Sequence, residues 1–263
     1  MIIGSALERV KPRLLCCAEI RKIVRQENRV AAWEHKLGLI VPSWNTVMEY
    51  ETQRMAGSVM SVHTQRIAHT ADTEENLMWM GTQVPAAAQL LAHAKVDVIC
   101  YGCTAGGFLK GPHYDRDMSA QIKTATGIPG TTSASAIVDA LNTLGVRHIS
   151  VATAYEPWLN AKVQQYLEAA GFTVPAIEGF GTQAHAAVTP DRVAALAKKV
   201  DRPDAQAVFI SCSNLRTLDI IETLERDLGK PVITSNQASL WGMLRLIGDR
   251  REIVGGGRLF REA

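Results

Sequence analysis

Two cysteines in this sequence are placed where a thiol can do chemistry, because each ends an apolar segment and precedes small polar residues. Cys103 follows VDVICYG at residues 96–102, and Cys212 follows AVFIS at residues 207–211. A thiol at the carboxyl end of a buried parallel strand lies where unpaired backbone N–H groups and a helix dipole favour an anion. The pattern therefore predicts a lowered thiol pKa at both positions, with nearby donors for a substrate carboxylate or oxyanion.

The competing explanation is that these cysteines are core residues, since cysteine is among the most commonly buried residue types. We expect that role for Cys100, which lies inside the strand before Cys103. Cys100 and Cys103 also form a CxxC pair, which is typical of redox centres or of half a zinc site. The sequence has no second pair of ligands at comparable spacing, so neither interpretation is favoured.

Other candidate substrate-binding residues share one position, the carboxyl end of a predicted strand or the turn after it. They are Ser43, Asn45, Thr104, Ala105, Tyr155, Ser213 and Asn214. Ligands bind at this edge of open α/β sheets. This position favours a binding role for residues that would otherwise be ordinary turn formers. Similar positions are occupied by Thr132, Ser133, Ser235 and Asn236, whereas His63 and Arg66 fit packing and binding equally well.

Short apolar runs alternate with helical patterns along the chain. Strands are predicted at 37–41, 58–67, 96–102, 148–154, 172–180, 207–211 and 231–235. Helices are predicted from about 46, at 76–94, 115–126, 133–144, 156–170, 190–200 and 215–228, and from about 237. Strands that are apolar on both faces and separated by single helices indicate parallel sheets with right-handed crossovers, an α/β fold.

An internal repeat makes this organisation more specific. Residues 96–108 and 206–218 share a strand, a cysteine, a hydroxyl residue and a helix start, and each is followed by Gly-x-Pro, a strand and a hydroxyl turn. The repeat predicts two pseudo-symmetric Rossmann-like domains with both cysteines facing the cleft between them. We assign residues 37–130 with 236–263 to the first domain, 131–235 to the second, and 1–36 to a basic helical extension.

Composition excludes several functional classes. A chain of 263 residues that is 47% hydrophobic and 21% charged is globular, and its net charge of +2 gives no support for a nucleic-acid partner. We expect no membrane partner and a cytoplasmic location, because no run of 18 apolar residues and no secretory signal pattern occurs. Five cysteines without framework spacing fit a reducing compartment. No GxGxxG, Walker, GxSxG or HExxH motif points to a bound cofactor, a serine nucleophile or a metal.

The segments that carry these features resemble the aspartate/glutamate racemase superfamily, and within it the maleate cis-trans isomerases and their arylmalonate decarboxylase relatives. The carrying motifs are GLIVPSWNTVMEYE (38–51), the Cys103 loop, VATAY (151–155), SCSNLRTL (211–218) and PVITSNQASLW (231–241). The resemblance implies an isomerase that needs no cofactor, forms a homodimer and acts on a small carboxylate or dicarboxylate in the cleft between two thiols.

The resemblance also implies residue roles. Cys103 would add to the double bond of maleate, Cys212 would handle the proton, and Asn45, Tyr155 and the backbone after each cysteine would contact the carboxylates. This sequence departs from the family pattern at Trp44, where a small residue is usual, and at Ala154, where proline is usual. A second substrate-binding asparagine expected within 180–184 is replaced by Thr182 or Gln183.

Two other functions remain open from the sequence. A racemase or epimerase of an amino acid or related small carboxylate would use the same two thiols as alternating acid and base on opposite faces of a carbon. A ligand-binding or sensor protein on the same scaffold would have no use for two activated thiols. Decarboxylases of this superfamily keep only the second cysteine, so retention of both argues against that activity.

Overall fold

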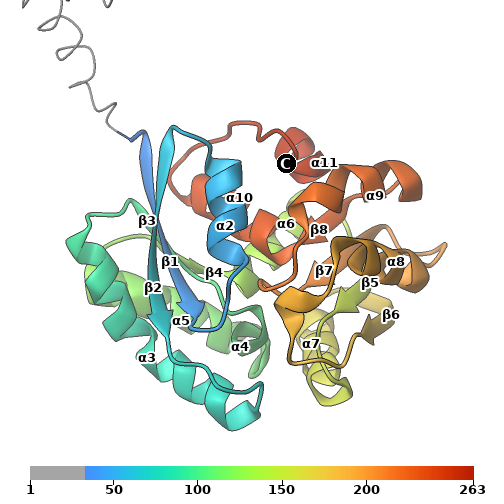
Figure 1. Ribbon diagram of the computed structural model, residues 1–263, viewed down its shortest axis with the longest axis horizontal. Coiled ribbons are helices and arrows are strands. Elements are labelled where there is room, and N and C mark those ends of the chain that lie inside the picture. Colours follow the sequence, from blue (N-terminus) through green and yellow to red (C-terminus); the bar gives the residue numbers. More distant parts are fainter. Residues whose placement is uncertain (1–32) are drawn as a thin grey trace, which may run out of the picture. The chain divides into compact units, whose positions relative to one another are not determined.

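Two four-stranded parallel sheets form the framework of the computed structural model, which describes residues 33–263 (Figure 1). The strands of the first sheet are β1 (His35–Pro42), β2 (Met60–Ile67), β3 (Val98–Tyr101) and β4 (Gly130–Thr132). Those of the second are β5 (His148–Thr153), β6 (Thr173–Gly179), β7 (Ala207–Ser211) and β8 (Val232–Thr234). The basic helical extension expected at 1–36 lies outside the described residues up to residue 32, and its last two residues, His35 and Lys36, belong to β1.

Helices connect the strands and cover the sheets. They are α2 (Met48–Ala56), α3 (Glu74–His93), α4 (Thr104–Phe108), α5 (Gly111–Thr126), α6 (Ser133–Thr143), α7 (Pro157–Ala169), α8 (Pro190–Val200), α9 (Ile221–Leu228), α10 (Ser235–Leu246) and α11 (Gly257–Glu262), with 3-10 turns at His185–Ala187 and Leu218–Ile220. All residues of the central strands β3 and β7 are buried, as a parallel sheet covered on both faces requires.

The two sheets repeat one topology. The order is β2-β1-β3-β4 in the first and β6-β5-β7-β8 in the second, and every pairing is parallel. Cys103 follows β3 and Cys212 follows β7, so the two cysteines occupy equivalent places in the two halves. The predicted α/β fold with two pseudo-symmetric halves is confirmed.

The segment after β7 differs from the prediction. A helix was expected from residue 215, but α9 begins at Ile221, and the residues from Cys212 to Leu215 form a buried turn. Helix α10 packs on α6, α2, β3 and β4, whereas α11 packs on α9 and β8. The C-terminal segment therefore contacts both halves, and the domain boundaries given above remain a proposal.

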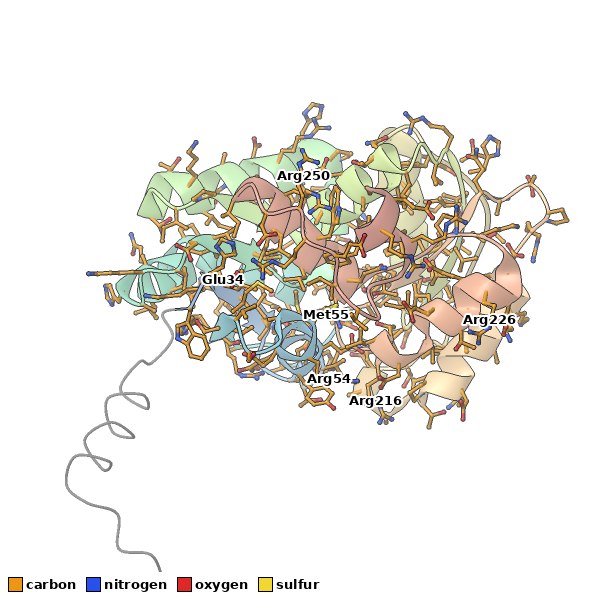
Figure 2. The ribbon with its side chains drawn as sticks, turned by 90° about the horizontal axis from the view of Figure 1, so that it is seen from above. Glu34, Arg54, Met55, Arg216, Arg226 and Arg250 are labelled. Atoms are coloured by element: carbon orange, nitrogen blue, oxygen red, sulfur yellow. The ribbon has the colours of Figure 1, made fainter. Side chains whose placement is uncertain are left out.

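A buried carboxylate joins the two halves. Glu51 on α2 is only 3% exposed and accepts hydrogen bonds from Thr217 N at 2.6 Å, Leu218 N at 2.8 Å and Asn236 Nδ2 at 2.7 Å. Burial raises the pKa of Glu51, an effect that these donors oppose. One turn further along α2, Arg54 pairs at the surface with Asp219, on the side of the molecule where Figure 2 labels Arg54 and Arg216.

Within the part of the chain that the structure describes, no helix is both long enough and apolar enough to cross a membrane.

Candidate active site

One pocket lies where the carboxyl ends of strands from both sheets meet. It has an empty volume of about 270 Å³. Its lining residues are Pro42, Trp44, Asn45, His69, Asp72, Cys103, Thr104, Ala105, Tyr155, His185, Cys212, Ser213 and Asn214. Six of the seven residues predicted to contact substrate are among them, together with both cysteines, and this is the edge at which open α/β sheets bind ligands.

Cys103 is a buried thiol at the start of α4. It is 4% exposed and is the N-cap residue of this helix of five residues. A Cβ atom on Gly106 would lie 3.3 Å from Cys103 Sγ and 2.9 Å from the Tyr101 hydroxyl, so glycine leaves room for the sulfur there. Burial raises the pKa of Cys103 to about 12. The lowered pKa predicted for this thiol is wrong, because desolvation outweighs the backbone donor at Gly106.

Cys212 has a different environment. Its φ of 147° is in a region that side chains rarely adopt, and its N–H donates to Ser235 Oγ at 3.1 Å. The sulfur accepts a hydrogen bond from Asn214 N at 3.4 Å and lies 3.5 Å from Nδ1 of His185. The strained turn therefore aims Cys212 Sγ at two nitrogen atoms.

His185 belongs to a chain of polar contacts that crosses the pocket wall. Its Nε2 lies 3.1 Å from Asp72 Oδ2, an ion-pair distance without the alignment of a hydrogen bond. The other Asp72 oxygen lies 3.0 Å from His69 Nε2, and His69 Nδ1 lies 2.6 Å from Asn76 Oδ1. Trp44 packs edge-on against both imidazoles, with ring centroids 4.3 Å from His69 and 5.8 Å from His185.

The charges in this cluster stabilise one another. Burial alone would raise the pKa of Asp72, but its contacts with His185 and His69 lower it to about 2. Burial alone would lower the pKa of His185, but the neighbouring Cys212 and Asp72 raise it to about 10. Asp72 is therefore a carboxylate, and His185 favours the imidazolium form whenever Cys212 is a thiolate.

Three of the expected substrate contacts also connect the two halves. Asn45 Nδ2 donates to Ser213 Oγ at 3.0 Å, and Ser213 Oγ donates to Gly102 O at 2.7 Å. Asn214 Oδ1 accepts from Thr46 N at 3.0 Å. Asn45 keeps one amide N–H for a ligand, while the Ser213 hydroxyl has already used its proton.

Of the remaining expected contacts, Thr104, Ala105 and Tyr155 line the pocket and Ser43 does not. Thr104 Oγ1 is buried and has no hydrogen-bond partner among residues 33–263, so it is a free donor at the pocket. Burial raises the pKa of Tyr155 well above its ordinary value, which keeps this hydroxyl neutral. Ala105 lines the pocket, but Ser43 does not; its exposed side chain accepts from His69 N at 3.0 Å and positions that histidine's loop.

Sequence reasoning missed His69, Asp72 and His185. Within 180–184, Gln183 is exposed and accepts from Asp72 N at 3.1 Å, and His185, just beyond that stretch, lines the pocket. The other weighed residues have packing partners. His63 contacts Ser61, Arg66 pairs with Glu49, Thr132 caps α6, and Ser133 contacts Ser239. Asn236 binds Glu51, and Ser235 supports Cys212.

Cys100 is fully buried in β3, as expected for a core residue, and burial raises its pKa to about 12. Across residues 33–263, no group of three or more His, Cys, Asp or Glu side chains is arranged to hold a metal ion.

Comparison with known proteins places this chain in a family. The family model for arylmalonate decarboxylase matches residues 37–260. A maleate isomerase of Nocardia farcinica is 30% identical over 240 residues, which is 86% of this chain and 96% of that protein. An arylmalonate decarboxylase of Bordetella bronchiseptica is 32% identical over 166 residues, which is 61% of this chain and 69% of that protein.

Solved structures agree with this placement. A maleate isomerase from Pseudomonas putida superposes with a TM-score of 0.83 at 27% identity, covering 86% of this chain and 98% of that one. A cysteine-to-serine mutant of Nocardia farcinica maleate cis-trans isomerase, with a covalently bound succinylcysteine intermediate, gives 0.82 at 26% identity, covering 87% and 99%. The chain is thus a member of the arylmalonate decarboxylase family, within the aspartate/glutamate racemase superfamily.

Proposed function

We propose that this chain is a cis-trans isomerase of maleate or a similar small cis-dicarboxylate and that it works without a cofactor. The observation that carries the proposal is the presence of two cysteines, from equivalent strands of the two halves, in one small pocket. The long match to maleate isomerases supports this substrate class. A relative that holds a succinylcysteine supports a thioether intermediate.

The proposed reaction uses the thiols in sequence. The Cys103 thiol gives its proton to a base in the pocket as its sulfur forms a bond to one alkene carbon, and the π electrons move to the other carbon, where the adjacent carboxylate stabilises them. Cys212 protonates that carbon, and the resulting single bond rotates. Removal of a proton by Cys212 and departure of the Cys103 sulfur then restore the double bond in the trans form.

The pocket offers neutral donors for two carboxylates. Among residues 33–263, Thr104 Oγ1 has no partner and Asn45 keeps one unused amide N–H, while Tyr155 stays protonated. These groups come from both halves, so a substrate held by them would lie between the two sulfur atoms. Donors that are already fixed in place need little reorganisation when charge develops on the substrate.

The test is conversion of maleate to fumarate by the purified protein, followed by ultraviolet absorbance without added cofactor. We expect Cys103→Ala and Cys212→Ala each to lower kcat by at least about a thousandfold, because each removes a reacting group. Cys100→Ala is the matched control and should keep activity, since that thiol lies in the core. Turnover that survives in either pocket variant would contradict the proposed chemistry.

A second candidate, racemisation of a small amino acid, is favoured by one observation. Asp72 places a carboxylate in the pocket wall, where it could accept an ammonium group of the substrate. Proton exchange at Cα of amino-acid enantiomers in D₂O, measured by nuclear magnetic resonance, separates the two candidates. Exchange without maleate turnover would select the racemase.

A further inference from the structure

The two pocket thiols have unequal surroundings, and the difference lies in one cluster of side chains. Among the pocket-lining residues of the described chain there is no lysine or arginine. The groups that can carry positive charge beside a thiolate are therefore His69 and His185. Of these, His185 contacts sulfur, with Nδ1 at 3.5 Å from Cys212 Sγ.

Asp72 fixes which state His185 adopts. A carboxylate 3.1 Å from Nε2 keeps a proton on that nitrogen, so Nδ1 is the atom that exchanges a proton with Cys212. When the proton is on Nδ1, the imidazolium lies between two negative groups, a thiolate and a carboxylate. The cluster is 3–9% exposed, so water screens these attractions weakly.

The backbone adds a second donor to the same sulfur. Asn214 N–H points at Cys212 Sγ from 3.4 Å, and hydrogen bonds to the charged form of a group favour that form. Cys103 has no comparable positive neighbour among residues 33–263, and its burial favours the neutral thiol.

We propose that Cys212, His185 and Asp72 form a proton relay in which His185 holds Cys212 as a thiolate and Asp72 holds His185 in place. Cys212 is then the base that accepts the proton of the Cys103 thiol as the Cys103 sulfur adds to the substrate. The same proton passes from Cys212 to the substrate carbon, and the steps reverse during elimination. Only the use of this proton rests on the proposed isomerase function; the charge state of Cys212 does not.

His185 acts through Cys212, so it is a positioning residue, and its role should appear in a pH profile. The other titratable groups that face the cluster are His69, Tyr155 and Cys103. Tyr155 and Cys103 stay neutral through the working range because burial raises both of their pKa values. His69 contacts Asp72 but forms no hydrogen bond to a sulfur atom within residues 33–263, which makes it the matched control.

The experiment is alkylation of the full chain by iodoacetamide between pH 5 and 9, with modification of Cys212 read from its own peptide by mass spectrometry. The background is Cys103→Ala, so that one pocket thiol remains. We expect His185→Gln to slow alkylation at pH 6 by about tenfold or more and to move the midpoint of the rate profile upward by at least about one pH unit. Asp72→Asn should shift it in the same direction, and His69→Gln should shift it less.

Circular dichroism would establish that each variant is folded. If His185→Gln does not fold, Asp72→Asn still tests the relay. A midpoint that stays unchanged in both His185→Gln and Asp72→Asn would overturn the relay. An upward shift in these variants, together with a wild-type protein that does not isomerise maleate, would support the relay and reject the proposed substrate. The two proposals can therefore fail separately.

Discussion

At the scale of single residues, the pocket treats its two sulfur atoms differently although the strands that carry them are equivalent. Cys103 is buried beside Gly106 and the neutral hydroxyl of Tyr101, and Cys212 faces an imidazole and a backbone N–H. Strand-end position alone predicts the location of a reactive thiol, but its charge depends on side chains from other loops. This is why the expected pKa direction was wrong for Cys103.

Trp44 sets the size of the pocket at the residue scale. Its indole lies against His69 and His185 and forms one wall. We expect Trp44→Ala to raise the ratio of kcat/KM for 2-methylmaleate to that for maleate by about tenfold or more, because the shorter side chain leaves room for the extra methyl group. Steady-state kinetics with both substrates measures this ratio.

Trp79→Ala is the matched control for that measurement, since Trp79 lies exposed on α3 outside the pocket. An unchanged substrate ratio in Trp44→Ala would show that another wall limits substrate size.

At the scale of elements, the relay depends on loops that follow the edge strands. The loop after β2 carries His69 and Asp72, and the turn after β6 carries His185. These residues are far apart in the sequence and lie several positions beyond their strands. Sequence patterns located the strand ends well, because apolar runs there are unambiguous, but they carry no information about which loops meet across a cleft.

The same reasoning explains the late start of α9. The helical pattern begins at residue 215, but polar atoms at its start and just before it bind the other half: Ser213 to Gly102, Asn214 to Thr46, and Thr217 to Glu51. Tertiary hydrogen bonds outweighed local propensity there. The strands and most other helices form near their predicted positions, since each buries an apolar face in both the local pattern and the fold.

A buried carboxylate on α5 gives an element-scale prediction. Asp115 accepts from Thr132, Ser135 and Tyr166, so it joins α5 to the start of α6 and to α7. Burial raises the pKa of Asp115 to about 6 from 3.8. An acid whose pKa is higher in the folded state contributes its full stabilisation below its unfolded pKa of 3.8. This contribution is lost as the pH rises through the folded pKa of about 6.

We therefore expect the stability of the wild type relative to Asp115→Asn to fall by about 1–2 kcal/mol between pH 5 and pH 8. Urea unfolding of both proteins at the two pH values measures this difference. A gap that stays constant with pH would show that Asp115 does not change protonation in this range.

At the scale of the whole molecule, the pocket depends on the two halves staying in contact, because both supply its lining residues. Glu51 is a buried connection between them, because it accepts hydrogen bonds from two backbone N–H groups of the other half and from the amide of Asn236. Replacement by glutamine puts a donor where these groups need an acceptor. We expect Glu51→Gln to lower the free energy of unfolding by about 2–3 kcal/mol and to reduce kcat, measured by urea unfolding and turnover.

Arg54→Gln is the control for this prediction, since it removes the exposed pair with Asp219 from the same helix (Figure 2). An exposed pair contributes little, so this variant should change stability by less than about 1 kcal/mol. Equal losses of unfolding free energy in Glu51→Gln and Arg54→Gln would indicate that the buried hydrogen bonds stabilise the protein no more than the exposed ion pair.

The repeated sheet order has a consequence for how such a site can arise. If two identical half-length chains assembled into this arrangement, every substitution would appear on both sides, and both thiols would gain a histidine or neither would. Once one polypeptide contains both halves, the loop after β6 and the loop after β2 can acquire different substitutions. Covalent joining of the halves is thus what permits a symmetric scaffold to place an imidazole beside only one of two equivalent sulfur atoms in a single pocket.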